Sequence, residues 1–398
     1  MIETIAKPKI SFENTEIAFS SKTNSELRRA YWLFKVINVN FLVKVGPPIT
    51  MLAMNIGLPI KSIIKATIFK HFCGGETIND CDNSIELLRK YKVGGILDYS
   101  VEGVEDEKVF ENTTSEILAT IIRAGNSDNI PFAVFKITGI ARFALLEKIQ
   151  RKESLSQEEE AEFAKVKRRV DLICARASKN GIPIMFDAEE TWIQDVIDDL
   201  CIEMMKKYNH EFAVVYNTYQ LYRHDRLAFL KKNYQQADQE GYFLGAKLVR
   251  GAYMEKERKR AEEQNYPSPI QPDKASTDRD YDLALAFCVE HLHKIGFVAG
   301  THNEDSCRKL TELMAENGVA ENHQNIFFSQ LLGMSDNLSF NLAHEGFNVA
   351  KYVPYGPVKA VLPYLFRRAN ENTAIAGQMG RELKLIVSEI KRRKMKFV

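Results

Sequence analysis

The sequence predicts an α/β protein in which eight parallel strands close into a barrel behind a helical N-terminal region. Eight short hydrophobic runs recur between residues 95 and 353, and helix-length segments separate them. Runs of nearly continuous hydrophobicity are typical of strands that are covered on both faces. The runs span about 260 residues, which suits a (βα)8 barrel, and closure leaves no strand edge exposed. An open doubly wound sheet is the less economical alternative.

The predicted strands occupy residues 95–100, 132–138, 182–187, 212–217, 244–249, 297–301, 326–330 and 349–353. One intervening helix is well marked, because Ser156 and Glu159 form a capping box at its start and Gly181 follows its end. From residue 25 to about residue 90 the pattern is helical. The chain therefore divides into a helical N-terminal region (1–90), a barrel (91–377) and a basic C-terminal helix or tail (378–398).

Composition and charge exclude several classes of protein. Hydrophobic residues make up 45% of the 398 residues and charged residues 27%, which is typical of globular proteins and not of collagen-like, disordered or membrane-embedded chains. With 54 basic and 53 acidic residues, the net charge of +1 gives no general attraction to nucleic acid. The six cysteines include no C-x-x-C pair, so buried free thiols are expected rather than a zinc ribbon.

The N-terminal residues carry no recognisable targeting pattern. Residues 1–20 lack the charged and apolar sequence of a secretory signal, and their acidic residues do not suit a transit peptide. The longest apolar stretch near the N-terminus, residues 49–60, is interrupted and is too short to cross a bilayer. We therefore expect an intracellular protein in a reducing compartment, without a transmembrane helix.

Polar side chains gather where the predicted strands end. Barrel enzymes place their reacting groups at the carboxyl ends of the strands. Lys136 and Asp187 each follow apolar strand residues, where a charge is costly unless it is paired or functional. Each polar residue taken alone is as consistent with a structural ion pair, but their coincidence across the strand ends predicts one active-site mouth. The residues are Asp98, Glu102, Lys136, Thr138, Asp187, Glu189, Glu190, Asn217, Gln220, Lys247, Arg250, Thr301, His302, Asn303, Gln330 and Tyr352.

A helix is predicted after the last strand. Tyr364, Arg367, Arg368 and Glu371 fall at i, i+3, i+4 and i+7, so they share one face. A solvated face with an Arg–Glu pair is the ordinary interpretation. Here the two adjacent arginines interrupt an apolar sequence and no acidic residue precedes Glu371, so a double guanidinium clamp for a carboxylate is favoured.

Other nucleotide and metal motifs are absent. No G-x-G-x-x-G follows a predicted strand and there is no G-x-x-x-x-G-K-[ST]. His291 and His293 lie two positions apart and cannot share a helix face, so no metal site is predicted. His302 directly follows a strand, and with residues 247–253 (KLVRGAY) it offers cations and a glycine for close approach of a phosphate-bearing cofactor.

Three segments resemble the flavin-dependent proline dehydrogenases. They are residues 247–253 (KLVRGAY), 301–303 (THN) and 364–371 (YLFRRANE), the last matching the family's Y-x-x-R-R-x-x-E pattern. Supporting segments extend the resemblance over about residues 95–375. The residues in these segments are most similar to those of stand-alone eukaryotic-type members. The segments are residues 135–136, 187–190, 217–220 and 330–334.

This resemblance implies a distorted TIM-type barrel that holds FAD and oxidises L-proline to 1-pyrroline-5-carboxylate, with hydride transfer to the flavin and electrons passed to membrane quinone. The implied catalytic residues are Asp187 and Lys247, with Lys247 donating toward flavin N5. The implied substrate contacts are Lys136, Leu331, Tyr352, Tyr364, Arg367 and Arg368. The implied cofactor contacts are Asn217, Lys247, Arg250, Gly251, Ala252, Thr301 and His302. Glu102 is implied as a gate that pairs with Arg367 over the mouth.

Two alternative functions stay open: hydroxyproline oxidation and a function without flavin. Hydroxyproline-oxidising members of the family carry a smaller residue at the position of Tyr352, so Tyr352 favours proline as the substrate. Several bacterial relatives have arginine at the position of Lys247, which keeps the charge there but changes the donor geometry. A different class of function is a non-flavin carboxylate-binding barrel, or a lyase that uses Lys136 as a Schiff-base amine.

The C-terminal tail is strongly basic. Five of the last eight residues are Lys391, Arg392, Arg393, Lys394 and Lys396, and apolar residues precede them. Such a segment suits an anionic membrane surface. Together with the quinone acceptor implied by the resemblance, it predicts a cytoplasmic protein peripherally associated with the inner membrane, on the matrix side in a mitochondrion.

Overall fold

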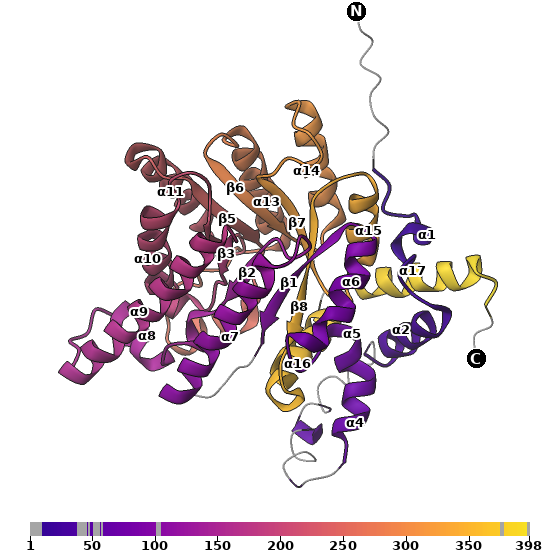
Figure 1. The fold of residues 1–398 in the computed structure, drawn as a ribbon, viewed down its shortest axis with the longest axis horizontal. Helices are drawn as coiled ribbons and strands as arrows, with labels where there is room; N and C mark the ends of the chain where they lie inside the picture. Colours follow the sequence, from indigo (N-terminus) through magenta and orange to yellow (C-terminus); the bar gives the residue numbers. More distant parts are fainter. Residues whose placement is uncertain are drawn as a thin grey trace, which may run out of the picture.

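A computed structural model describes residues 10–37, 46, 48–50, 56, 59–100, 105–374 and 378–395, without the side chains of 369–374 and 378–379. Eight parallel strands form a nearly closed barrel, as predicted (Figure 1). The ladder runs β1-β8-β7-β6-β5-β4-β3-β2, and β1 lies in contact with β2. The strands are β1 (Val93–Tyr99), β2 (Ala133–Phe135), β3 (Ile184–Phe186), β4 (Val215–Gln220), β5 (Leu244–Val249), β6 (Ile295–Gly300), β7 (Ile326–Leu331) and β8 (Val349–Tyr355).

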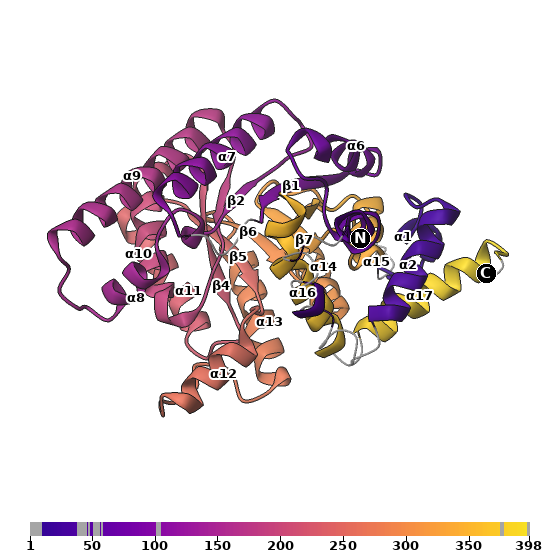
Figure 2. The same cartoon turned by 90° about the horizontal axis from the view of Figure 1, so that it is seen from below.

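Helices cover the outside of this barrel (Figures 1 and 2). The predicted capping box is present, because the Ser156 side chain accepts from the Glu159 amide and the Glu159 side chain accepts from the Ser156 amide. Gly181 ends the same helix at φ +64°. The outer helices are α7 (Glu107–Gly125), α8 (Phe143–Gln150), α9 (Gln157–Asn180), α10 (Thr191–Tyr208), α11 (Arg226–Glu240), α12 (Met254–Glu263), α13 (Lys274–Glu290), α14 (Glu304–Glu316), α15 (Asp336–His344) and α16 (Val358–Ala374).

Two strands, β2 and β4, have an end that lies three residues from the predicted range, and side-chain hydrogen bonds explain both differences. β4 was expected at 212–217 but begins at Val215, because the Asn209 side chain accepts from the Val214 and Val215 amides before the ladder starts. β2 ends at Phe135, because the amide and hydroxyl of Thr138 both donate to the Glu189 carboxylate and take that residue out of the ladder.

The interior of the barrel is a packed core and not a channel. Inward side chains from six strands and their approaches fill it, and they lie beneath the polar residues of the mouth. The outward side chains of the same strands pack against the helices in a larger core. The interior residues are Ile96, Phe132, Val134, Met185, Ala213, Tyr216, Val298, Ala350 and Tyr352.

Helices from both ends of the chain pack together beside α16 (Figures 1 and 2). Leu27 and Phe34 of α2 share one buried cluster with Val361 of α16 and with Leu385 and Ile386 of α17. The chain ends thus cover the side of α16 that faces away from the barrel. The helical elements of this cluster are α1 (Thr15–Ala18), α2 (Asn24–Ile37), α4 (Lys61–Ile64), the π-helical turn η1 (Lys65–Phe69), α5 (Lys70–Phe72) and α17 (Gln378–Arg392), whereas η2 (Asn79–Cys81) and α6 (Asp82–Lys90) pack on the barrel core.

The six cysteines are free and buried, in agreement with the sequence analysis. None of the helices formed by the described residues combines the length and the apolar character needed to span a bilayer.

Candidate active site

Side chains from three strands meet at the centre of the mouth. Lys247 points inward from β5 because its neighbours Ala246 and Leu248 face the helices. Its ammonium forms an ion pair with Asp187, which directly follows β3, and donates to the hydroxyl of Tyr352 on β8 at 2.7 Å. Lys247 and Tyr352 are both more than nine-tenths buried. The structure therefore brings together the two residues predicted to be catalytic and one predicted to contact the substrate.

Asp98 lies near the carboxyl end of β1 with its side chain facing inward, and it adds a second carboxylate to this mouth. The Ser100 hydroxyl donates to it at 2.8 Å. Burial raises the pKa of the Asp98 carboxyl, the charge of Lys136 opposes this shift, and the charge of Asp187 adds to it. The positive charges of two lysines thus offset the negative charges of two carboxylates at the mouth. The four residues are Lys136, Lys247, Asp98 and Asp187. The sequence analysis collected Asp98 among the strand-end residues but gave it no role.

Tyr253 connects the mouth to α16. It is the last residue of the KLVRGAY segment and had no assigned function. Burial raises the pKa of its phenol, while the positive charges of Lys136 and Arg367 act in the opposite direction. Two of the predicted carboxylate-binding cations therefore lie near one phenol, although they come from elements more than two hundred residues apart in the sequence.

The arginine face of α16 is not a solvated surface. Tyr364 is 6% exposed and Arg368 is 8% exposed, and the Arg368 guanidinium lies 5.3 Å from the centre of the Tyr364 ring. Arg367 is half-buried. Two adjacent guanidinium groups on a largely buried face have the planar donor geometry that suits a carboxylate. The Glu371 side chain lies outside the described residues.

The ends of β5 and β6 carry the predicted cofactor contacts. Arg250 donates to Asp278 at 2.7 Å, to the Thr301 hydroxyl at 2.8 Å and to the Ser306 hydroxyl at 3.0 Å. Gly251 follows with φ +137°, and a Cβ there would lie 2.5 Å from the Tyr222 ring. Only glycine fits such a backbone position.

His302 is held beside this group. Its Nδ1 lies 2.9 Å from the Ser335 hydroxyl, which comes from the loop after β7. Burial, with the charges of Lys351, Arg368 and Arg250, lowers the pKa of His302 to about 3. The imidazole is therefore neutral at physiological pH and can offer one N–H and one lone pair.

These residues fit a flavin with a phosphate-bearing tail. The donors comprise an ammonium (Lys247), a guanidinium (Arg250), a hydroxyl (Thr301) and a neutral imidazole (His302), which suit phosphate and ring carbonyl oxygens. The hydroxyl of Ser329 is buried on the inward side of β7, next to Gly300, and has no hydrogen-bond partner among the described residues. A buried hydroxyl without a partner is costly, so a ligand atom there would stabilise the site.

Asn217 does not join this group. Its side chain donates to Asp198 of α10 at 2.9 Å, and Arg226 donates to the other oxygen of Asp198 at 2.6 Å. Asn217 thus faces the helices, because it alternates with the inward Tyr216 and Thr218 along β4. The cofactor contact expected of Asn217 has no support from this arrangement.

The fold agrees with comparisons to known proteins. The family model described as proline dehydrogenase matches residues 81–381. The chain belongs to the proline dehydrogenase family. A proline dehydrogenase 1, mitochondrial, from Dictyostelium discoideum is 32% identical over 426 residues, covering 96% of this chain and 74% of the relative. One from Homo sapiens is 40% identical over 241 residues, covering 60% of this chain and 40% of the relative.

Solved structures confirm the fold of this proline dehydrogenase family member. Proline utilization A from Bdellovibrio bacteriovorus superposes with a TM-score of 0.71 at 18% sequence identity, covering 93% of this chain. The chain spans 40% of that structure's length. At this level of identity the likeness shows the barrel alone, and the residue roles rest on the geometry of the mouth.

The loop after β7 is fixed by residues that the sequence analysis missed. Lys351 of β8, 1% exposed, donates to the carbonyls of Leu331 and Met334 at 3.3 and 2.7 Å. Glu382 of α17 accepts from the Ser335 amide. This loop carries Leu331 on one side and the hydroxyl that holds His302 on the other. The one local signal was a lysine inside an otherwise apolar strand segment.

Two further expectations have different outcomes. Glu102, the predicted gate, lies outside the described residues, so its role stays a prediction. The basic tail is partly tied to the protein, because Arg392 forms an ion pair with Glu16 of α1 at 3.3 Å. Arg393 also donates to the carbonyls of Phe19 and Lys22, each at 2.8 Å. Lys396 lies outside the described residues.

Proposed function

We propose that this chain oxidises L-proline to 1-pyrroline-5-carboxylate with FAD as the hydride acceptor. One observation carries the proposal: α16 places the buried Arg368 and the half-buried Arg367 beside a mouth that already holds Lys136 and Lys247. The two lysines face carboxylates of the mouth, whereas adjacent guanidinium groups on one helix suit the planar carboxylate of a ligand. Family membership makes that ligand an amino acid with a ring nitrogen.

The side chains then divide into two groups around the substrate. Lys136, Arg367 and Arg368 would bind the carboxylate, while Tyr352, Tyr364 and Leu331 would wall the apolar ring. Fixing the reacting carbon in this way can supply about 7–11 kcal/mol of the barrier reduction through positioning alone. When bound, FAD would supply the hydride acceptor, and the amine proton would leave to complete the C=N bond.

Asp187 and Lys247 would act as the catalytic pair on the cofactor side. The ion pair with Asp187 and the hydrogen bond to the Tyr352 hydroxyl hold the Lys247 amino group in place at the mouth. A fixed cation there stabilises negative charge that develops on the cofactor as the substrate is oxidised. Arg250, Gly251, Ala252, Thr301 and His302 would hold the rest of the cofactor.

The proposed electron acceptor is a membrane quinone, reached from a peripheral position on the inner membrane. The curated relatives from Dictyostelium discoideum and Homo sapiens are named mitochondrial. We propose a cytoplasmic or matrix-side location on this basis, with a membrane surface as the partner and no nucleic acid.

The two alternative activities are weaker. Tyr352 is fixed by Lys247 on one side and by the sulfur of Met185 at 3.6 Å on the other, so it cannot swing away to admit a ring hydroxyl. This favours proline over hydroxyproline. Lys136 lies near the carboxyls of Asp98 and Glu189, and nothing in this arrangement specifically favours a Schiff-base amine.

An absorbance spectrum recorded without oxygen, before and after addition of L-proline, tests the proposal. We expect flavin absorbance that proline bleaches, and reoxidation by a soluble quinone analogue. A protein that shows no flavin absorbance even after FAD is supplied contradicts the proposal, and a covalent adduct trapped by borohydride supports the lyase instead.

A further inference from the structure

The N-terminal helices gather exposed apolar side chains. Eleven large hydrophobic residues are exposed among the described residues, and five of them lie between positions 32 and 63. The remaining six are isolated, with no two on the same element. Scattered exposed residues are ordinary, but a local concentration marks an interaction surface. The five are Trp32, Val36, Ile49, Ile56 and Ile63.

The same region concentrates positive charge. Residues 24–37 and 59–76 contain six basic and two acidic residues, whereas the whole chain has a net charge of only +1. The basic residues are Arg28, Arg29, Lys35, Lys61, Lys65 and Lys70, and the acidic ones are Glu26 and Glu76. The basic excess is therefore a local feature of these helices and not a property of the protein as a whole.

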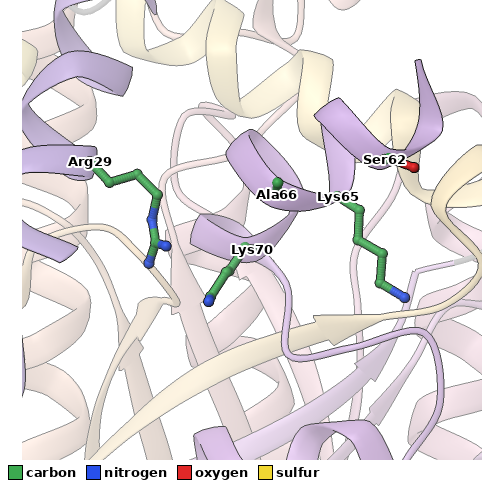
Figure 3. Close-up of a pocket in the computed structure, with 5 residues that line it drawn as sticks. All are labelled: Arg29, Ser62, Lys65, Ala66 and Lys70. Atoms are coloured by element: carbon green, nitrogen blue, oxygen red, sulfur yellow. The ribbon is translucent and has the colours of Figure 1, made fainter. Parts of the chain in front are cut away.

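An open groove of about 410 Å³ separates α2 from the helices that follow it. Figure 3 shows Arg29 and Lys70 approaching this space from opposite sides, while Lys65 turns away. Lys65 is paired with Glu76 at 2.6 Å, whereas the ion pair that Arg29 forms with Glu26, among the described residues, is long at 3.9 Å. Lys70 forms no ion pair with any residue that the structure describes. The groove therefore holds two cations that lack a close counter-charge.

One face of α2 carries a cationic side chain followed by two exposed apolar side chains. Arg29, Trp32 and Val36 stand at i, i+3 and i+7, so they project to the same side. Trp32 is 47% exposed and Val36 is 50% exposed. Across the groove, Ile63 of α4 is 64% exposed and adjoins Ser62, which lines it. Tryptophan and basic residues on one exposed face are typical of helices that lie at the boundary between lipid headgroups and acyl chains.

We infer that this face of α2, α4 and α5 docks on an anionic lipid bilayer. Trp32, Val36 and Ile63 would enter the headgroup region, and Arg29 and Lys70 would bind lipid phosphates or carboxylates at the groove. The inference rests on the membrane partner of the proposed function and names the surface that makes the contact. We infer this face as the membrane contact in place of the C-terminal tail, because Arg392 and Arg393 of the tail are paired with Glu389.

The docking face lies one helix away from the substrate. α16 packs against α2, α4 and η1, shares a buried cluster with them through Val361 and Leu365, and carries Arg367 and Arg368 in its next turn. Glu76 accepts from the Val358 amide at the start of α16 at 3.3 Å and pairs with Lys61 and Lys65. A bilayer held at this face would therefore bring a lipid-dissolved acceptor close to the mouth.

Fluorescence of the full-length, FAD-loaded protein provides the first test. The chain has two tryptophans, Trp32 and Trp192, so a Trp192→Phe variant reports Trp32 alone. We expect the Trp32 emission to shift to the blue when vesicles of phosphatidylcholine and phosphatidylserine are added. Pure phosphatidylcholine should give a smaller shift, and high salt should reverse the binding. An unchanged Trp32 spectrum in a protein that sediments with the vesicles overturns the inference.

Charge variants with matched controls provide the second test. Each basic residue near an anionic surface is worth about fivefold in partitioning, so Arg29→Gln/Lys70→Gln should bind vesicles about 20–30-fold more weakly. Arg168→Gln/Lys232→Gln removes the same charges from exposed positions on α9 and α11 and should bind like the parent. Equal losses in both variants indicate attraction by net charge and contradict a defined face.

A tail variant separates the two membrane hypotheses. Lys391→Gln/Lys394→Gln removes two exposed tail lysines and should leave vesicle binding unchanged. Weaker binding by this variant, with normal binding by Arg29→Gln/Lys70→Gln, assigns the contact to the tail and overturns the inference. Flavin bleaching by proline in solution is measured on every variant. If proline does not bleach the flavin of the parent protein, the proposed function is wrong. If proline bleaches the flavin but the parent does not bind anionic vesicles, only this inference is wrong.

Discussion

Lys351 and Asp336 form an ion pair at 2.9 Å in which neither side chain is more than 7% exposed. Lys22, from the turn before α2, contacts the other oxygen of Asp336 at 2.8 Å. Burial alone would raise the pKa of Asp336, but the two lysines hold it well below its usual range. The same Lys351 ammonium binds the carbonyls of Leu331 and Met334, so this pair sets the position of a loop at the rim of the mouth.

Replacement of Lys351 by methionine should impair both stability and substrate binding. Removing one partner of a buried ion pair costs about 3–5 kcal/mol in the free energy of unfolding, because the other charge stays buried. The apparent proline affinity should also fall, since Leu331 loses the contact that fixes its carbonyl. Urea unfolding and proline titration check the two effects. Lys309→Met, at an exposed position on α14, is the control, and a Lys351→Met protein that matches it removes Lys351 from the site.

Arg367→Met and Arg368→Met should each weaken proline binding with little effect on bound FAD. A charge-assisted hydrogen bond contributes about 1.5–3 kcal/mol, so the apparent affinity should fall by roughly 10–150-fold. Anaerobic titration of the flavin absorbance with proline measures this affinity. Arg168→Met removes an exposed guanidinium from α9 and should bind proline normally. Parent-like affinity in either α16 variant contradicts the clamp.

The residues at the mouth were predictable in part because strands alternate their side chains. Lys136, Asp187, Lys247 and Tyr352 end or follow apolar strands, and the structure brings them to one opening. The cofactor contact implied for Asn217 by the resemblance stays a prediction, and the side chain itself points to Asp198 of α10. The observed β4 runs on to Gln220, whose amide donates to the Glu189 carbonyl at 2.8 Å. Because side chains alternate along a strand, Asn217 faces the helices while Tyr216 and Thr218 face inward.

The network around Lys351 was not predictable for a different reason. Its members Lys22, Asp336 and Glu382 come from three regions that are far apart in the sequence, and no local spacing relates them. Periodicity reports which side of an element is buried, but not which distant element will cover it. A buried charge inside a strand is the most that the sequence reveals of such a contact.

Lys247 and Asp187 should show strong energetic coupling. Lys247→Met and Asp187→Asn each leave one charge of a buried pair without its partner, at a cost of about 3–5 kcal/mol. The double variant removes both charges, so its loss of stability should be smaller than the two single losses combined, by about 0.5–3 kcal/mol. Urea unfolding of the four proteins completes the cycle. Strictly additive losses show that the contact between the two side chains contributes nothing.

Glu382→Gln should change how stability depends on pH. Burial, with the charge of Asp336, raises the pKa of Glu382 to about 7. The folded protein therefore keeps a proton that the unfolded chain releases above pH about 4.5, so this carboxyl lowers stability progressively as the pH rises toward 7. The full cost above pH 7 is about 3 kcal/mol. Glutamine can still accept from the Ser335 amide but carries no charge.

The variant should match the parent near pH 4.5 and be more stable by up to about 3 kcal/mol at pH 8. Thermal unfolding at both values measures the difference, with Glu345→Gln at the exposed end of α15 as the control. A parent protein that is more stable than Glu382→Gln at pH 8 shows that the ionised carboxylate is stabilised by the neighbouring lysines after all.

The meeting of the two chain ends has a consequence for synthesis on the ribosome. Ala18, Phe19 and Leu27 emerge early, but the helix that covers them, α17, is made more than three hundred residues later. Throughout that interval their apolar faces lack the part of their native contacts that α17 provides, and exposed apolar surface in an unfinished chain invites aggregation. The barrel can condense as its strands appear in order, whereas the terminal helices must wait for the last segment. The packing of the N-terminal helices against α17 is thus a late step between distant parts of the chain. A nascent chain stalled before α17 should depend on chaperones to remain soluble.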